Sequence, residues 1–341
     1  MHRIRSLIST ISLVPLVAAQ TYTSCNPLKS TSCPADEGLS SSSLTSDFTS
    51  SSLPAKWNIT AGSSLIDYGS GGTTFTIKES GDAPTIETEF YVFFGVISVF
   101  LKSAPGTGIV SSVVLESDDL DEIDWEWIGG DDSKVQTNYF GKGNTTTYNR
   151  ELWVAAADCQ TTAHNYTVNW QSDKTEWYVD GTLTRTLNYA DAVDGTNYPQ
   201  TPMRVKVGIW AGGDTSLNSE GTVEWAGGAT NFSQGPFTMT LEKVVIVNQN
   251  PASSYTYGDE SGSYTSIKID GANSTTDTVS TARAAGNSTT SASNASGTAV
   301  ASSASSSTAA ITTTSAGSGF VVEGMAKALF ACVLGAAAFL I

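Results

Sequence analysis

Three acidic side chains occur at alternate positions of one short segment. Residues 121–128 read Asp-Glu-Ile-Asp-Trp-Glu-Trp-Ile. Alternate side chains of an extended strand share a face, so Glu122, Asp124 and Glu126 point one way and the isoleucine and tryptophans between them point the other. The apolar face predicts burial in a core. The acidic face has no such structural purpose, and it is therefore the first candidate for chemistry.

Carboxylates about 7 Å apart along a strand repel one another, so structural reasons for the row must be weighed first. An acidic edge strand would discourage pairing with other chains, and a calcium site would also collect carboxylates. The two tryptophans argue instead for a strand deep in a sheet, and calcium usually draws on loop carbonyls as well. The row therefore favours catalysis over either structural reading.

Glycoside cleavage is the reaction that needs one ionised and one protonated carboxyl group without a metal or a histidine. A third acid between them can raise the pKa of one neighbour and orient the other. In a flat strand the Cα atoms of Glu122 and Glu126 lie about 13 Å apart. A retaining pair of carboxyl groups therefore requires long side chains that lean together on a curved sheet.

Composition narrows the chemistry further. The chain has 341 residues, two histidines and a formal net charge of -16. The acidic charge argues against nucleic-acid binding, which needs clustered cations. His2 and His164 cannot build a metal centre of several histidines, so we expect no metal and no cofactor.

The elements that must position the acidic row are strands. Residues 20–270 alternate between apolar and polar with a period of two, and no long helical segment is found. Strands are expected at Thr73–Lys78, Ile86–Leu101, Ile109–Leu115, Lys134–Phe140, Tyr166–Trp170, Glu176–Val179, Arg204–Trp210 and Phe237–Val247. Asp180-Gly181 is a hairpin turn between two such runs. This pattern predicts an all-β protein with two antiparallel sheets packed as a sandwich.

The acidic segment resembles the Glu-x-Asp-x-Glu signature of glycoside hydrolase family 16. Three further segments are similar to the fungal Crh group of cell-wall transglycosylases in that family, namely Pro105–Ser112, Val135–Phe140 and Glu224–Gly228. The resemblance covers residues 20–250. It implies a concanavalin-like β-jelly roll with a concave sugar-binding cleft.

The resemblance also implies roles for the acidic row in a retaining reaction. Glu122 is expected to be the nucleophile, Glu126 the proton donor and general acid/base, and Asp124 the helper between them. The implied donor is chitin, and the implied acceptor is chitin or β-glucan, so the product would crosslink wall polysaccharides. Weak chitin hydrolysis is the implied side reaction. A plain endo-β-glucanase or chitinase on the same fold, and a non-catalytic wall carbohydrate-binding protein, remain alternatives.

The substrate-binding residues follow less directly from the sequence. Sugar rings stack on aromatic side chains, and buried polar groups hold their hydroxyls. Besides Glu126, the expected binding residues are Lys206, Trp210, Thr222, Trp225, Gln136 and Asn138. Core packing is the alternative for each tryptophan, and a surface cation is the alternative for Lys206.

Both ends of the chain resemble processing signals. Residues 1–19 are expected to be a cleaved signal peptide and residues 20–270 the catalytic domain. The Ser/Thr-rich residues 271–317 are typical of a glycosylated stalk. Residues 318–341 are expected to be a GPI-attachment propeptide, with Ser315 or Gly317 as the attachment residue. The protein is thus expected to be secreted and held at the plasma membrane by a GPI anchor or linked to the cell wall.

The cysteines and the Asn-x-Ser/Thr motifs are those of a secreted protein. Cys25 and Cys33 are expected to form a disulfide in an oxidising compartment, which leaves Cys159 as a buried cysteine or, less favoured, a catalytic thiol. Seven motifs predict N-glycosylation, at Asn58, Asn144, Asn165, Asn231, Asn273, Asn287 and Asn294.

Overall fold

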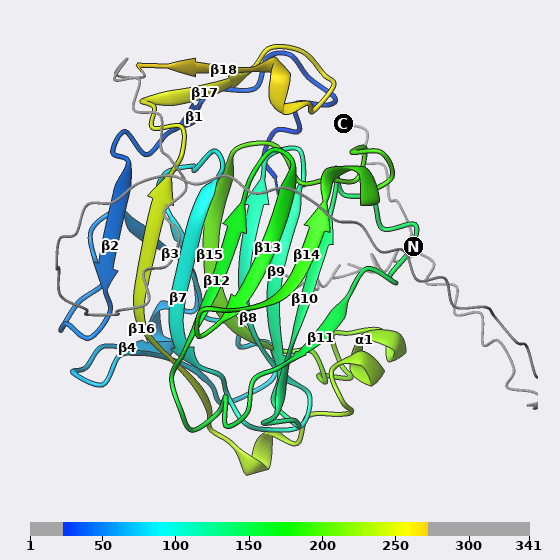
Figure 1. Cartoon of the computed structure of the whole chain (residues 1–341). Helices are drawn as coiled ribbons and strands as arrows, with labels where there is room; N and C mark the ends of the chain where they lie inside the picture. The colour runs from blue at the N-terminus through cyan, green and yellow to red at the C-terminus, as the bar shows by residue number, and fades with distance from the viewer. Residues whose placement is uncertain (1–22, 272–341) are drawn as a thin grey trace, which may run out of the picture. The chain divides into compact units, whose positions relative to one another are not determined.

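A computed structural model describes residues 23–271, and these residues form two large antiparallel sheets packed face to face (Figure 1). The expected signal peptide, stalk and GPI-attachment segment lie outside the described residues, as do Asn273, Asn287, Asn294, Ser315 and Gly317. The prediction of an all-β sandwich of two antiparallel sheets is confirmed.

The first large sheet has seven strands and carries the acidic row. In spatial order the strands are β11 (Leu152–Ala155), β10 (Lys134–Phe140), β9 (Glu122–Ile128), β8 (Ile109–Ser117), β15 (Met203–Ala211), β6 (Thr85–Thr88) and β3 (Trp57–Ala61). Each neighbouring pair is antiparallel.

The second large sheet has eight strands and closes the other side of the core. Its order is β14 (Thr182–Asn188), β13 (Lys174–Val179), β12 (His164–Trp170), β7 (Gly95–Lys102), β16 (Phe237–Asn248), β5 (Thr73–Ile77) and β4 (Ile66–Asp67), with β2 (Ser43–Asp47) also paired to β16. The long strand β16 therefore has three partners along its length.

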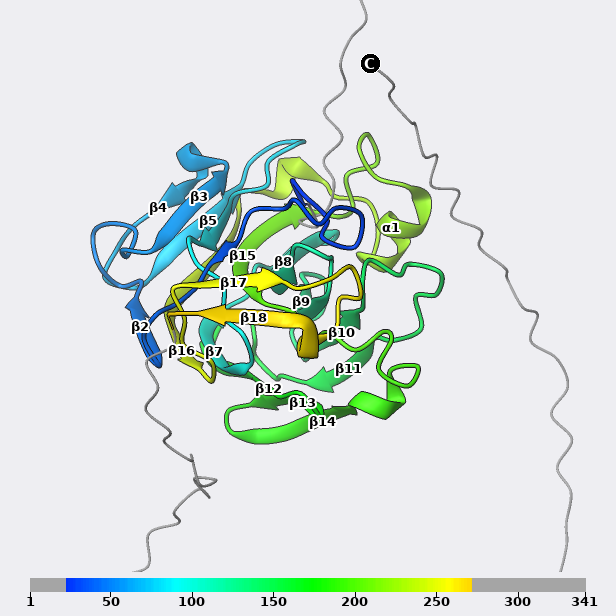
Figure 2. The same ribbon diagram turned by 90° about the horizontal axis from the view of Figure 1, so that it is seen from above.

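A third, small sheet crosses the ends of the two large ones, as Figure 2 shows from above. It consists of β1 (Asp36–Glu37), β17 (Ser254–Tyr257) and β18 (Ile267–Asp270). Helical structure among the described residues is limited to α1 (Glu220–Trp225) and four 3-10 turns, η1 (Ser63–Leu65), η2 (Tyr189–Asp191), η3 (Phe232–Gln234) and η4 (Tyr264–Ser266). None of the helices in residues 23–271 has the length and apolar character needed to cross a membrane.

The core lies between the two large sheets and is rich in aromatic side chains. Trp125 and Trp127 of β9 are at most 1% exposed, and both pack edge-on against Tyr166 of the opposite sheet. Alternation along β9 thus sends the tryptophans inward and the acidic side chains to the other face, which we call the outer face of the seven-stranded sheet.

One expected strand is wrong. The run Ile86–Leu101 was expected to be continuous, but it is divided between β6 in one sheet and β7 in the other. Phe94 and Gly95 have positive φ angles of 56° and 140° where the chain turns into the second sheet. A Cβ on Gly95 would lie 1.9 Å from the carbonyl oxygen of Val247, so only glycine fits there. The sequence pattern did not predict this crossing between sheets, because both halves of the run are apolar and buried.

The other expected strands match observed ones, with ends that differ by a few residues. The expected hairpin is also present, since Asp180 and Gly181 connect β13 to β14 with φ angles of 49° and 78°. Two consecutive positive φ angles are the geometry that favours an Asp-Gly turn.

Candidate active site

The acidic row lies in the interior of the seven-stranded sheet. Strand β9 is paired along its whole length with β8 on one side and β10 on the other. Glu122 and Glu126 are partly exposed, whereas Asp124 between them is only 2% exposed. An edge strand that uses acids to prevent pairing is therefore excluded.

The strand register places a defined partner on each side of each acid, because directly opposed residues share a face. Glu126 lies between Gln136 and Ser112, Asp124 between Asn138 and Val114, and Glu122 between Phe140 and Glu116. Gln136 and Asn138 thus flank the row from β10, where they were expected. The Gln136 amide nitrogen is buried without a protein partner, and the Asn138 side-chain oxygen accepts a hydrogen bond from the Tyr139 backbone.

Burial and mutual repulsion change the proton affinity of two of the three acids. Burial raises the pKa of Glu126 to about 8, and the nearby Glu122 adds to the effect. Burial also raises the pKa of Asp124 well above its usual range, with further contributions from both glutamates and from a hydrogen bond with Glu122. With its pKa near 8, Glu126 is protonated at neutral pH, and the pKa of Asp124 is shifted in the same direction, so the row contains an acid that can donate a proton.

Lys206 lies on the same outer face and is not a surface cation. It is 8% exposed and forms an ion pair with Glu116 of β8. Lys206 is opposite Val114 in the register and so lies in the same cross-strand row as Asp124. Glu116 was not predictable from the sequence, because a single acid at the end of an apolar strand does not reveal which residue it opposes.

Two stacked tryptophans mark one end of the outer face. The rings of Trp210 and Trp225 are 6.0 Å apart with an interplanar angle of 23°, and they pack with Ile128 of β9 and the partly buried Trp153. Trp210 is 7% exposed, so most of its surface already contacts protein. The tryptophans expected for sugar binding are therefore near the acidic strand, and Trp225 and Trp153 have the more accessible rings.

Thr222 is in the first turn of α1, on the same helix as Trp225. Its backbone N–H donates a hydrogen bond to the Ser219 side chain, which caps the helix, and the two hydroxyl groups are 3.0 Å apart. The structure thus gives Thr222 a structural role in the helix that carries Trp225. Of the two residues, Trp225 is the one that contacts Trp210.

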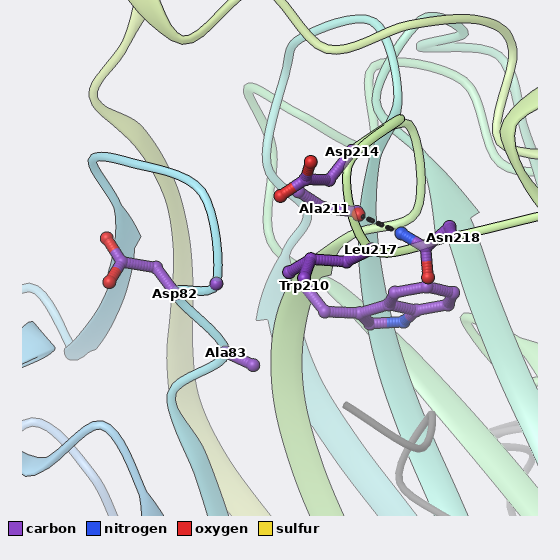
Figure 3. A pocket seen from close by; sticks show the side chains of 8 residues that line it. Asp82, Ala83, Trp210, Ala211, Asp214, Leu217 and Asn218 are labelled. Atoms are coloured by element: carbon purple, nitrogen blue, oxygen red, sulfur yellow. Dashed lines mark hydrogen bonds between the residues drawn. The ribbon is translucent and has the colours of Figure 1, made fainter. Parts of the chain in front are cut away.

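A small pocket adjoins Trp210, and none of the three acids lines it (Figure 3). Its wall includes Asp82, Ala83, Asp214 and Asn218, and the Asn218 side-chain nitrogen donates to the Ala211 carbonyl oxygen at 2.8 Å.

The structure shows the state of Cys25, Cys33 and Cys159 and the contact of His164. Cys25 and Cys33 form a disulfide. Cys159 is buried and free, and burial raises the pKa of its thiol to about 11, which argues against a catalytic thiol. His164 contacts Asp180 at 2.7 Å, far along the chain from the acidic row.

Four of the predicted N-glycosylation sites are described. Asn58 and Asn231 are exposed, and Asn144 and Asn165 are partly buried. Asn58 is directly opposite Glu87 of β6, which in turn is opposite Lys206, so its side chain lies at the β3 edge of the outer face.

Residues 23–271 contain no cluster of three or more His, Cys, Asp or Glu side chains suited to a metal ion.

Comparison with known proteins decides the family. Residues 54–227 match the family described as Glycosyl hydrolases family 16. The chain belongs to this family. Crh-like protein 5 of Aspergillus fumigatus is 56% identical over 261 residues, which are 76% of this chain and 65% of that protein. The chain thus spans just under two thirds of the length of this curated relative.

Solved structures agree with the fold. The structure titled Crh5 transglycosylase in complex with NAG has 56% identity and a TM-score of 0.70, and the match covers 72% of this chain and 100% of that one. A Bacillus licheniformis beta-glucanase has 25% identity and a TM-score of 0.52, over 61% of this chain and 99% of that one. The β-jelly roll implied by the sequence resemblance is confirmed for this family 16 chain.

Proposed function

We propose that this protein is a retaining transglycosylase that cleaves chitin and transfers the cleaved chain to chitin or β-glucan in a fungal cell wall. The observation that carries the proposal is the acidic row itself. Three carboxyl groups share the outer face of an interior strand, and burial raises the pKa of two of them, Glu126 and Asp124. Such a row costs stability and has a purpose only if protons must move there.

In the first half of the reaction Glu126 donates its proton to the oxygen of the scissile bond. The Glu122 carboxylate attacks the anomeric carbon as that bond breaks, which gives a glycosyl ester on Glu122 and a free reducing-end fragment. Protonated Asp124 donates a hydrogen bond to Glu122, so the nucleophile keeps its charge and its orientation.

In the second half an acceptor hydroxyl attacks the same carbon and loses its proton to Glu126. The ester bond to Glu122 breaks, and the enzyme returns to its starting protonation state. If water replaces the acceptor, the product is a hydrolysed chain. The same residues therefore serve both transfer and the side reaction of chitin hydrolysis.

Two observations support the proposed substrate class, one from a solved relative and one from the side chains of this protein. A solved relative at 56% identity is named a transglycosylase and contains NAG, the sugar unit of chitin. In this chain Trp210 and Trp225 offer stacked rings beside the acidic strand, and Lys206, Gln136 and Asn138 offer polar groups along it. We propose that these residues, with Thr222 supporting Trp225, hold the sugar chain across the outer face.

Secretion and wall attachment belong to the same proposal. The signal peptide at 1–19, the catalytic domain at 20–270, the stalk at 271–317 and the GPI-attachment segment at 318–341 would deliver the domain to the polymers it joins.

The test uses the secreted protein with a chitin oligosaccharide donor and two fluorescent acceptors, one of chitin and one of β-1,3-glucan. Labelled products longer than either acceptor, resolved by mass, are the expected result and would name the acceptor. Shortened chitin without labelled products would instead indicate a hydrolase. Binding without any change in either sugar would indicate a carbohydrate-binding protein.

A further inference from the structure

A fourth carboxylate lies next to the acidic row, and the proposed reaction does not use it. Glu116 of β8 is directly opposite Glu122 of β9 and is 3% exposed. Like charges directly opposed across two strands destabilise a sheet. A buried carboxylate in this place needs compensation, and its charge must act on the row beside it.

The compensating cation is Lys206. It forms an ion pair with Glu116, and both side chains are nearly buried. Arg204 is directly opposite Glu116 in the register, yet its guanidinium binds Glu87 of β6 at 2.6 Å. The two cations of β15 therefore have separate partners, and Lys206 is the one whose cross-strand row includes Asp124.

Other charged groups lie around the row, and each has partners of its own. Arg185 donates hydrogen bonds to backbone oxygens of Thr137 and Arg150 and also interacts electrostatically with Asp124. Lys134 pairs with Asp131 at 3.2 Å. Arg150 lies over the Phe140 ring and interacts electrostatically with Glu122, while its guanidinium donates to loop carbonyls. On the β10 side, the residues opposite the three acids are uncharged.

We propose that Glu116 and Lys206 form a positioning pair whose balanced charges set the pH range in which the acidic row is active. This inference rests on the proposed function, since it concerns the same three acids. Neither residue would take part in a bond change. The negative charge of Glu116 favours protonation of the three acids, and the positive charge of Lys206 opposes it. The two charges together therefore set the pH at which the acids gain or lose protons. The direct electrostatic effect of Glu116 on the pKa of Asp124 agrees with this arrangement.

Removing one partner at a time should therefore move the pH profile in opposite directions. Glu116→Gln removes a negative charge and leaves Lys206 to act on the acids, so both limbs of the kcat/KM profile should shift to lower pH. Lys206→Met leaves the Glu116 charge uncompensated, so both limbs should shift to higher pH. A unit charge about 7 Å away, in surroundings of intermediate dielectric, shifts a pKa by about half a unit to one unit.

The control is Glu176→Gln, which removes the same chemical group from the ion pair with Lys174 on β13 of the other large sheet. Stacked sheets lie about 10 Å apart and Glu176 is on the sheet that does not contain β9, so the profile of this variant should stay within about 0.2 unit of wild type. The double variant Glu116→Gln/Lys206→Met removes both charges, and its limbs should return to within about 0.3 unit of wild type. If Lys206→Met fails to fold, the comparison of Glu116→Gln with Glu176→Gln decides alone.

The measurements are the kcat/KM profile of chitin cleavage and, without substrate, the titration of 13C-labelled carboxyl groups by NMR. Opposite shifts in the single variants support the pair. Profiles that superimpose on wild type after scaling, or shifts in one direction for both variants, overturn it. Because the NMR titration needs no turnover, it tests the pair even if wild-type protein transfers no sugar, whereas absence of turnover in wild type would overturn only the proposed function.

Discussion

Replacing Glu126 by glutamine should make the protein more stable and less active at the same time. Gln has nearly the same shape as Glu but cannot titrate. In the native protein burial and Glu122 raise the pKa of Glu126 to about 8. An unfolded chain titrates Glu near 4.3, so the native state holds a proton that the unfolded state releases between these two values.

The sign of the stability effect follows from this proton. Since the native state binds more protons than the unfolded state between about pH 4 and pH 8, the wild-type free energy of unfolding falls as pH rises through this window. Each pKa unit corresponds to about 1.4 kcal/mol, and the partial exposure of Glu126 reduces the full value to roughly 2 to 4 kcal/mol. The free energy of unfolding of Glu126→Gln does not fall in this way. It should therefore be close to that of wild type at pH 4 and exceed it by roughly 2 to 4 kcal/mol at pH 8.5.

Activity should change in the opposite direction. Loss of a general acid lowers the rate by roughly 100- to 10,000-fold, so transfer from an unactivated chitin donor should fall by that factor in Glu126→Gln. The gain in stability and the loss of activity have one cause, which is the cost of keeping a titratable carboxyl group in this place.

The assay is urea unfolding at intervals from pH 4 to pH 8.5, followed by fluorescence of the buried tryptophans, with wild type and the exposed-site variant Glu89→Gln as references. The stability difference between Glu126→Gln and wild type should grow with pH, and that for Glu89→Gln should not. A difference that is flat with pH, or that favours wild type at pH 8.5, would show that native Glu126 does not hold the extra proton.

Four further variants test the roles of Asp124, Asp36, Gly95 and Cys159. Asp124→Asn should lose activity only partly and shift the pH optimum, because Asp124 assists Glu122 without bonding to sugar; an unchanged pH profile would contradict this role. Burial and the nearby Asp118 raise the pKa of Asp36 to about 8, so the stability of Asp36→Asn relative to wild type should rise from pH 4 to pH 8 in urea unfolding, and a constant difference would count against it. Gly95→Ala should lose at least about 3 kcal/mol in the same measurement because its Cβ would collide with a strand carbonyl, and a loss below about 1 kcal/mol would show that the chain turn can relax. Cys159→Ala should transfer sugar at the wild-type rate, and a large loss of rate without unfolding would revive the catalytic thiol.

The sandwich and the acidic row were predictable because both depend on local alternation. Trp125 and Trp127 require a core, and the period of two then places the acids on the opposite face. Lys206 and Trp210 share a face of β15 for the same reason, and the register confirms that they do. Each of these features is contained within a single strand.

Features that depend on which strands meet were not predictable from the pattern. The ion pair of Glu116 with Lys206 joins two strands about 90 residues apart in the chain, and only the observed register brings the two side chains together. Alternation did not predict the division of Ile86–Leu101 between two sheets, because both halves are apolar. The chain crosses at Gly95, where the structure has a positive φ angle. Alternation reveals the face of a residue but not its neighbours across the sheet.

The site at which the sugar becomes attached to the protein tests whether Glu122 is the nucleophile. Glu126→Gln should react with a nitrophenyl chitooligosaccharide, whose leaving group needs no acid, and then release the sugar slowly. Peptide mapping by mass spectrometry should find the added sugar mass on Glu122, and Glu122→Gln treated in the same way should carry none. Sugar attached to a different residue, or release of nitrophenol by Glu122→Gln at the rate of Glu126→Gln, would contradict the assignment of Glu122 as the nucleophile.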